Sequence, residues 1–244
     1  MVNGSLSLGA LVGVLLAGGF VYWQVGRYAS PQVPVTLFDE KREVYAFVIG
    51  LFAGVPLTLF LLFLTSAANR GAVTAALIDL AIVVAGAEVA QWALLRTRYF
   101  GEGSAAPFYA LGLRAGIGGI FSLGVVAQAL EQSTIAIGGL SVALLQSLAL
   151  VCLQVATALV ALPGRSPGRG VRGSPLSAGL LGAGGIGLLI LASNSGVVPG
   201  LVGAALVTAG AVIVYRGRRE ATLGSIRPAG APAPPSSPFG RREP

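Results

Sequence analysis

Long stretches without a charged side chain alternate along this chain with short clusters of charge. A helix needs about 20 mostly apolar residues to cross the roughly 30 Å hydrocarbon layer of a bilayer. Only 10% of the residues are charged, against about 25% in ordinary soluble domains. A chain this poor in charge could not cover the surface of a soluble protein. We therefore expect an all-α, polytopic membrane protein.

Seven segments have the length and apolar character of membrane spans. The sixth is short and rich in glycine, so the last two could instead form a shallow or re-entrant hairpin that turns at Ser193–Gly196. We expect the first span to be retained, because no Lys or Arg precedes it and no clear cleavage site follows. The predicted spans are Ser5–Val25, Val44–Thr65, Ala72–Leu95, Pro107–Leu130, Ile135–Leu162, Leu176–Ser193 and Val197–Tyr215.

The distribution of Lys and Arg predicts the orientation of these spans. Cytoplasmic loops of membrane proteins carry an excess of positive residues. If the amino terminus is outside and the carboxyl terminus inside, 14 of the 16 Lys and Arg lie on the cytoplasmic side. Arg70 then lies in an outer loop and Arg114 inside a span. Both tryptophans and all six tyrosines lie near the same inner ends, where aromatic rings favour the interface. We expect a multi-pass protein of a prokaryotic cytoplasmic membrane.

The chain divides into a transmembrane domain, residues 1–215, and a tail, residues 216–244, rich in Arg and Pro. We expect the tail to be cytoplasmic and disordered. Its first arginines, Arg216, Arg218 and Arg219, lie at the level of anionic lipid headgroups, each with an expected attraction of about 1 kcal/mol. The tail is not expected to bind nucleic acid, because no aromatic residue is interleaved among these arginines.

Missing residue types exclude several kinds of chemistry. The chain has no histidine, and Cys152 is its only cysteine. Histidine-bound metals, Ser-His or Cys-His catalysis and intrachain disulfides are therefore excluded. The last span lacks the lysine that retinal would need. A GxGxxG pattern at residues 182–187 lies inside an apolar span and not after a strand, which argues against a nucleotide site. We predict no metal, cofactor or catalytic residue, and the absence of a nucleophile–base pair argues against an enzyme.

Three ionisable side chains, Asp79, Glu88 and Arg114, lie within the predicted spans. Charges at membrane depth are costly and usually face the protein interior. Glu88 and Arg114 are each seven residues from the inner end of their spans, which places both about 10 Å deep at 1.5 Å per residue. Consecutive spans joined by a short loop are usually neighbours. We therefore expect a Glu88–Arg114 ion pair, either as a structural clamp or as a pair that contacts a substrate or ion.

Asp79 lies on the same span as Glu88, about half a turn around it and in its outer half. It could donate a hydrogen bond between helices, or bind a proton or a cation. Gln146 and Gln154 make the fifth span mildly polar, as suits the interior of a bundle. The candidate neighbours of Asp79 at its depth are polar and uncharged: Thr58, Ser141, Gln146 and Thr208.

Glycines recur at a spacing of four residues within the spans. Small residues at this spacing let membrane helices approach closely. The pattern predicts tight packing within the bundle, with homo-oligomer formation as the alternative. The pairs are Gly9 and Gly13, Gly50 and Gly54, and Gly112 and Gly116.

Two classes of function fit this sequence. The first is a small permease or an ion- or proton-coupled transporter, with Asp79, Glu88 and Arg114 as its polar core. The second is a non-transporting membrane scaffold or sensor subunit, whose tail and inner loops bind lipid or a cytoplasmic partner. A polar core open to water would favour the first class. A Glu88–Arg114 pair enclosed in a dry, glycine-packed bundle would favour the second.

Overall fold

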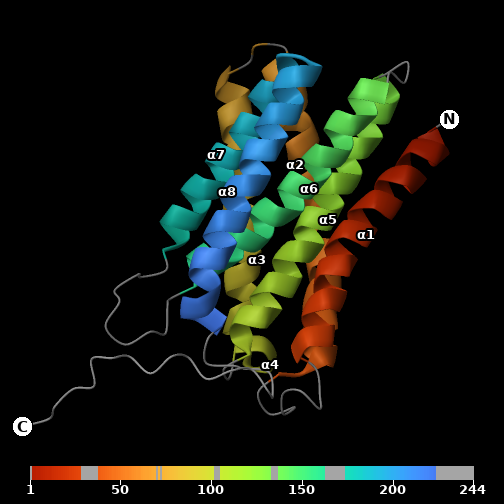
Figure 1. Ribbon diagram of the computed structural model, residues 1–244. Helices are drawn as coiled ribbons and strands as arrows, with labels where there is room; N and C mark the ends of the chain where they lie inside the picture. Colours follow the sequence, from red (N-terminus) through yellow and green to blue (C-terminus); the bar gives the residue numbers. More distant parts are fainter. Residues whose placement is uncertain are drawn as a thin grey trace, which may run out of the picture.

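The computed structural model describes residues 2–28, 38–69, 71, 73–101, 105–132, 137–162 and 174–223. Every regular element in these ranges is an α-helix, which confirms the all-α prediction for them. Figure 1 shows the long helices side by side in one bundle, with the short α4 at its lower end. The helices are α1 (Val2–Tyr28), α2 (Glu40–Asn69), α3 (Val73–Arg96), α4 (Arg98–Gly101), α5 (Ala106–Gln132), α6 (Ile137–Ala161), α7 (Pro175–Asn194) and α8 (Val197–Leu223).

Six helices in the described ranges are long and apolar enough to cross a membrane, namely α2, α3, α5, α6, α7 and α8. The helix α1, which has 27 residues, covers the first predicted span. Both α7 and α8 belong to the six, so each has the length of a full span and not only that of a re-entrant segment. These helices indicate a multi-pass membrane protein.

Several helices extend a few residues beyond the predicted spans, and two differences are larger. The loop between the third and fourth predicted spans contains a further helical turn, α4, which packs beside the end of α3. The last helix continues through residues 216–223, which were assigned to the tail. Arg216, Arg218 and Arg219 therefore lie on the final turns of α8. The rest of the predicted tail, residues 224–244, is outside the described residues.

Local signals in the sequence set several of the helix ends. Asp39 caps α2, because its carboxylate accepts the backbone N–H of Lys41 at 2.9 Å, an N-cap arrangement that satisfies an otherwise free donor. The helix α7 starts with Pro175 in its first turn, where the missing N–H of proline costs nothing. Between α7 and α8 the chain turns at Gly196, whose φ of 117° is accessible to glycine.

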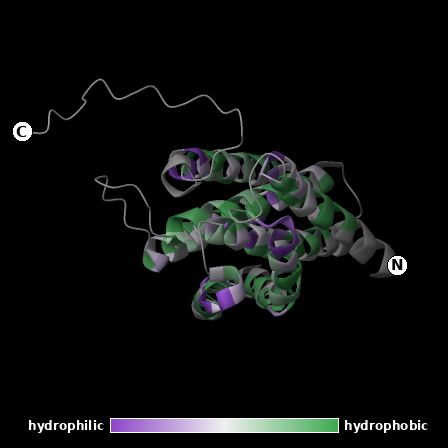
Figure 2. Cartoon of the chain, turned by 90° about the horizontal axis from the view of Figure 1, so that it is seen from below, coloured by the Kyte–Doolittle hydropathy of each residue, from purple (hydrophilic) through white to green (hydrophobic). Residues whose placement is uncertain are grey.

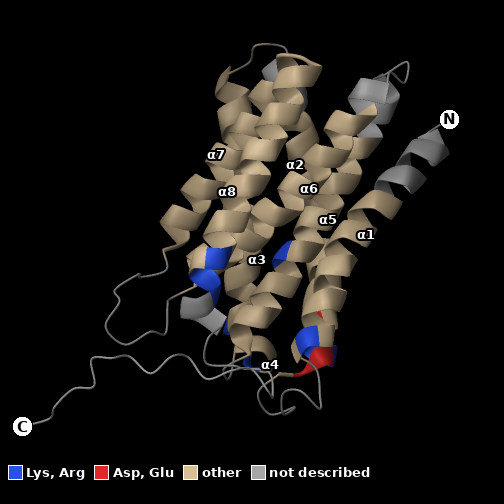
Figure 3. Cartoon of the chain, in the orientation of Figure 1, with Lys and Arg blue, Asp and Glu red and all other residues tan. Residues whose placement is uncertain are grey.

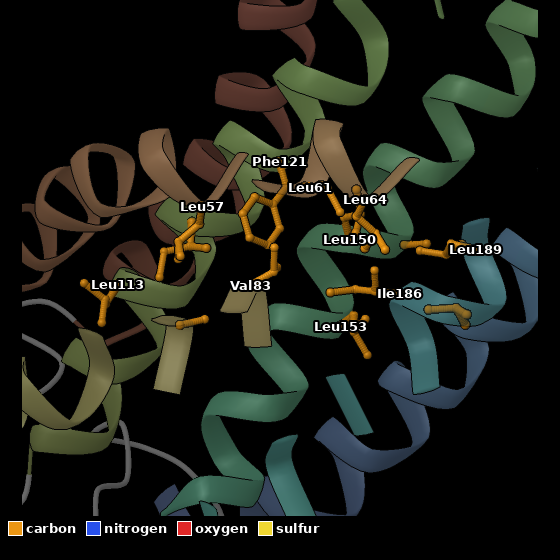
Figure 4. Close-up of a cluster of buried hydrophobic side chains, with 14 of the residues drawn as sticks. Leu57, Leu61, Leu64, Val83, Leu113, Phe121, Leu150, Leu153, Ile186 and Leu189 are labelled. Atoms are coloured by element: carbon orange, nitrogen blue, oxygen red, sulfur yellow. The ribbon is translucent and has the colours of Figure 1, made fainter. Parts of the chain in front are cut away.

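The helix α5 lies at the centre of the bundle and is packed against α1, α2 and α6. In turn α6 contacts α7 and α8, while α3 packs mainly against α2. Most residues of the apolar parts of α5 and α6 are buried, whereas in the other candidate spans only a minority are. Figure 4 shows apolar side chains from five of the helices meeting in the core, among them Leu57, Val83, Phe121, Leu150 and Ile186.

The outer helices expose large apolar side chains. Hydrophobic residues cover much of the bundle when it is seen along its axis in Figure 2. A surface of this kind is suited to lipid tails and not to water. Strongly exposed examples on four different helices are Phe52, Leu77, Leu180 and Ile213.

Glycines allow α5 to approach α1 and α2 closely. A β-carbon placed on Gly50 would collide with the backbone carbonyl of Leu113, and one on Gly116 with that of Phe47. On the other side of α5, a β-carbon on Gly13 would collide with the carbonyl of Gly119. The predicted use of these glycines in packing within the bundle is confirmed at these positions.

Candidate functional site

The largest fully buried side chain among the described residues is that of Arg114, two turns into the central helix α5. Its exposed fraction is 2%. A buried guanidinium is tolerated only when its donors are paired. The groups that pair with the Arg114 guanidinium therefore indicate the role of this region of the bundle.

Three side chains from two other helices surround the Arg114 guanidinium. Its Nη2 forms an ion pair with Oε1 of Glu88 on α3. Its Nε donates to Oε1 of Gln91, one turn further along α3, at 2.8 Å. Its Nη1 donates to Oε1 of Gln154 on α6 at 3.0 Å. All three nitrogens are thus engaged by groups of the protein itself.

The polar cluster is also anchored to the backbone of α6. Gln91 donates from Nε2 to the carbonyl of Ala158 at 3.3 Å. The side chains of Arg114, Glu88, Gln91 and Gln154, which we call the Arg114 cluster, therefore join α3, α5 and α6. Glu88 is its most accessible member, with 16% of its side chain exposed. A charge pair in such a network holds the register of the helices that it connects.

The contact between Glu88 and Arg114 is the one that their matched depth predicts. Gln154, a secondary candidate, belongs to the same cluster. Gln91 was not among the candidates, although its position three residues after Glu88 places it on the same face of α3. That spacing was the signal that could have found it.

Asp79 does not join the Arg114 cluster. Its side chain is partly exposed on α3, and among the described residues it makes no hydrogen bond or ion pair. Three of its expected neighbours bond elsewhere. Thr58 and Thr208 donate to carbonyls of their own helices, and Gln146 reaches α7, where it bonds to Ser193 Oγ at 2.6 Å. The three charges predicted as one polar core are therefore not brought together.

A second buried acid, Glu43, lies nearer the lower end of the bundle. It precedes the second predicted span, lies in the first turn of α2 and is fully buried. Neither of its carboxylate oxygens has a hydrogen-bond partner in the described part of the chain. The signal for its burial was its spacing of seven residues from Gly50, which puts both on the face of α2 that packs against α5.

Aromatic and basic side chains share the lower end of the bundle. Most of the Lys and Arg residues in the described part of the chain lie there, in blue in Figure 3. The guanidinium of Arg219 lies 5.8 Å from the ring centre of Trp23 and donates to the hydroxyl of Tyr28 at 2.9 Å. Arg42 pairs with Asp39 at 3.3 Å. Of the tail arginines named above, Arg216 is exposed and Arg218 and Arg219 are half-buried.

The described residues contain no group of three or more His, Cys, Asp or Glu side chains that could hold a metal ion. Comparison of the chain with protein-family models, with curated proteins and with solved structures finds no match. The functional argument therefore rests on the geometry of the bundle.

Proposed function

We propose that the chain is a seven-span protein of a prokaryotic cytoplasmic membrane, with its amino terminus outside and its carboxyl terminus inside. Support comes from the six apolar helices together with α1, and from the described basic residues, most of which lie at one end of the bundle in Figure 3. A concentration of Lys and Arg marks the cytoplasmic end of a membrane protein. In this orientation the ends of α1 and α8 that carry Trp23 and Arg219 face the cytoplasm.

For its activity, the geometry favours a membrane scaffold or sensor subunit that does not transport a solute. The observation that carries this proposal is that each of the three guanidinium nitrogens of Arg114 is bound by a side chain of the protein, namely Glu88, Gln91 or Gln154. A charge that binds a passing solute must exchange partners, whereas this one is held by side chains from two packed helices. The Arg114 cluster then serves as a clamp that fixes α3, α5 and α6 relative to one another.

In this proposal the cytoplasmic end of the bundle is the surface that binds lipid or a cytoplasmic partner. Arg216 and Arg218 extend from the last turns of α8, where they would meet anionic lipid headgroups. Homo-oligomer formation remains a proposal as well. Four of the glycines that could have formed an interface between copies pack instead against other helices of the same chain: Gly50, Gly54, Gly112 and Gly116. An oligomer would therefore have to use another face.

A proton-coupled permease is the second candidate. One observation favours it: Glu43 and Gln24 are both enclosed, and none of their four polar side-chain atoms has a hydrogen-bond partner in the described residues. Groups left in this state near one end of a bundle could take part in proton transfer. Asp79, on which the transporter hypothesis first depended, contributes less, because its side chain is partly exposed on an outer helix.

Proteoliposomes distinguish the two candidates. Purified protein is reconstituted, a proton or sodium gradient is imposed, and internal pH or sodium is followed while candidate solutes are added one at a time. The scaffold proposal predicts that, for every solute, the gradients in proteoliposomes decay as slowly as in protein-free liposomes. As a control, a protonophore should collapse the proton gradient in both kinds of liposome. Solute-dependent decay that is lost in Asp79→Asn or Glu43→Gln would establish a permease instead.

A further inference from the structure

Glu43 and Gln24 are buried polar side chains that the clamp does not use. Glu43 has an exposed fraction of 0% and Gln24 one of 1%. Within the described residues, neither carboxylate oxygen of Glu43 and neither amide atom of Gln24 has a hydrogen-bond partner. Buried polar groups are nearly always paired, and those that are not call for an explanation.

The carboxyl group of Glu43 packs against one residue of α5, Gly112. A β-carbon on Gly112 would lie 2.9 Å from Oε1 of Glu43 and 3.1 Å from its carboxyl carbon. Glycine therefore leaves the space that the carboxyl group occupies. On α2, Glu43 thus packs directly against the backbone of α5.

The register of α1 on α5 brings Gln24 to the same place. A β-carbon on Gly119 would lie 2.9 Å from Cβ of Ala17, and the two helices run in opposite directions (Figure 1). Gln24 is seven residues after Ala17, and Gly112 is seven residues before Gly119. Seven residues are close to two turns and keep the same face. This register puts Gln24 at the level of Gly112, on the face of α1 that packs against α5.

An ionised Glu43 would be unfavourable in this position, because a carboxylate removed from water needs compensating donors or a cation. A neutral carboxyl group changes the balance. It carries one O–H donor and one carbonyl acceptor, and these match the carbonyl and the amide group of a glutamine. The structure shows no hydrogen bond between the two side chains. One proton on the carboxyl, together with a change of side-chain rotamer, would let them satisfy each other beside Gly112.

The surroundings connect Glu43 with the cytoplasmic end. Tyr109 of α5 interacts electrostatically with Glu43, Asp39 and Arg42. Asp39 and Arg42 are already paired with each other at 3.3 Å. From α1 the facing group is Gln24, which does not titrate. Glu40, one turn before Glu43, is exposed, so water reaches α2 just below the buried carboxyl.

We infer that Glu43 and Gln24 form a proton-binding site, in which the carboxyl is protonated at neutral pH while α1 and α2 are packed on α5. Opening of this end of the bundle exposes the carboxyl and releases the proton to the cytoplasm. The packing of the three helices then responds to cytoplasmic pH. The site does not depend on whether the chain is a scaffold or a permease, because either one can be regulated by a proton.

Linkage gives the direction of the effect. Above the pH at which an exposed glutamate ionises, the folded chain holds one proton that the unfolded chain has lost, so stability falls as pH rises. For one proton the unfolding equilibrium constant changes about tenfold per pH unit. In Glu43→Gln the side chain is always neutral and can still pair with Gln24, so this part of the pH dependence disappears.

The test combines infrared spectroscopy with unfolding of the purified full chain in nanodiscs. At neutral pH we expect a carbonyl stretch from a protonated carboxyl in the wild type, which Glu43→Gln removes and the exposed control Glu40→Gln keeps. Asp79 also has no ion-pair partner among the described residues and could contribute a band of its own. The variant Asp79→Asn identifies that band. Gln24→Leu should keep the band of Glu43 but shift it to higher frequency, because the carbonyl loses a hydrogen bond.

Three results would overturn the site. The first is a wild-type spectrum without a protonated carboxyl at neutral pH, and the second is a band that persists in Glu43→Gln. The third is a stability that depends on sodium or potassium with the carboxyl ionised, since that would mean a cation site. Gln24→Leu retains Glu43, so its spectrum decides the matter even if Glu43→Gln does not fold.

Discussion

Arg114 donates its Nε–H to Oε1 of Gln91 at 2.8 Å, and Gln91 passes the connection on to the backbone of α6 by donating to the Ala158 carbonyl at 3.3 Å. A single amide thus links a buried charge on α5 to two neighbouring helices. With Glu88 on one side and Gln154 on the other, the guanidinium is enclosed by partners that the bundle itself supplies. This enclosure distinguishes a clamp from a site that exchanges ligands.

The first prediction concerns the ion pair. Glu88→Gln and Arg114→Gln should each destabilise the chain, and loss of one partner of a buried pair costs about 3–5 kcal/mol. Arg114→Gln should be the more severe, because it also leaves Gln91 and Gln154 without their donor. The double variant should lose less than the sum of the two. Unfolding in detergent or bilayers measures all three, and strict additivity would show that the two residues do not interact.

The second prediction concerns the close approach of α2 and α5. Gly50→Ala should destabilise the protein by about 1–3 kcal/mol, because its β-carbon would overlap the Leu113 carbonyl and force the helices apart. The matched control is Gly18→Ala on α1, where nothing lies within 4 Å of the new β-carbon. It should be neutral or gain up to about 1 kcal/mol from helix propensity. Equal effects in thermal unfolding would contradict this packing.

The third prediction tests topology across α7. With Cys152 replaced by alanine, Ser195→Cys should react with an impermeant maleimide on intact cells. Ser174→Cys, at the other end of the same helix, should react only after lysis. Labelling of both positions from one side would mean that α7 does not cross the membrane, and the reversed pattern would refute the N-out orientation.

The fourth prediction concerns Asp79. Its carboxyl has no bonding partner among the described residues, and it is partly exposed on α3. Asp79→Leu should therefore leave the unfolding free energy unchanged or raise it, because leucine suits a lipid-facing position better than a carboxyl group. A loss above 1 kcal/mol, on the order of a buried hydrogen bond, would show that Asp79 has a structural partner.

The fifth prediction concerns the last turns of α8. Anionic lipid should stabilise the wild type in nanodiscs more than it stabilises Arg216→Gln/Arg218→Gln, by about 1 kcal/mol for each arginine removed. The difference should shrink as salt is added, since exposed charges are screened. The comparison is of melting temperatures with and without anionic lipid. An identical lipid effect in both proteins would exclude these arginines from headgroup contact.

The approximate positions of the long helices could be predicted because hydrophobic length is read directly from the sequence. Depth along a helix follows in the same way from a rise of about 1.5 Å per residue, and for this reason Glu88 and Arg114 could be paired before any contact was known. The extension of α8 beyond Tyr215 was missed, because its arginines and glutamate end the apolar run without ending the helix.

By itself, then, the sequence determined how long each helix is and how deep each charge lies. The tertiary structure alone decided which way each helix is turned about its axis. It turned Asp79 away from the Arg114 cluster, brought Gln91 and Gln154 into it, and buried Glu43 against Gly112. The physical reason is that lipid and protein interior are both apolar, so the pattern of hydrophobic residues does not distinguish the outer face of a membrane helix from the inner one. That choice depends on close packing between residues distant in the chain, such as Gly50 against Leu113 and Ala17 against Gly119.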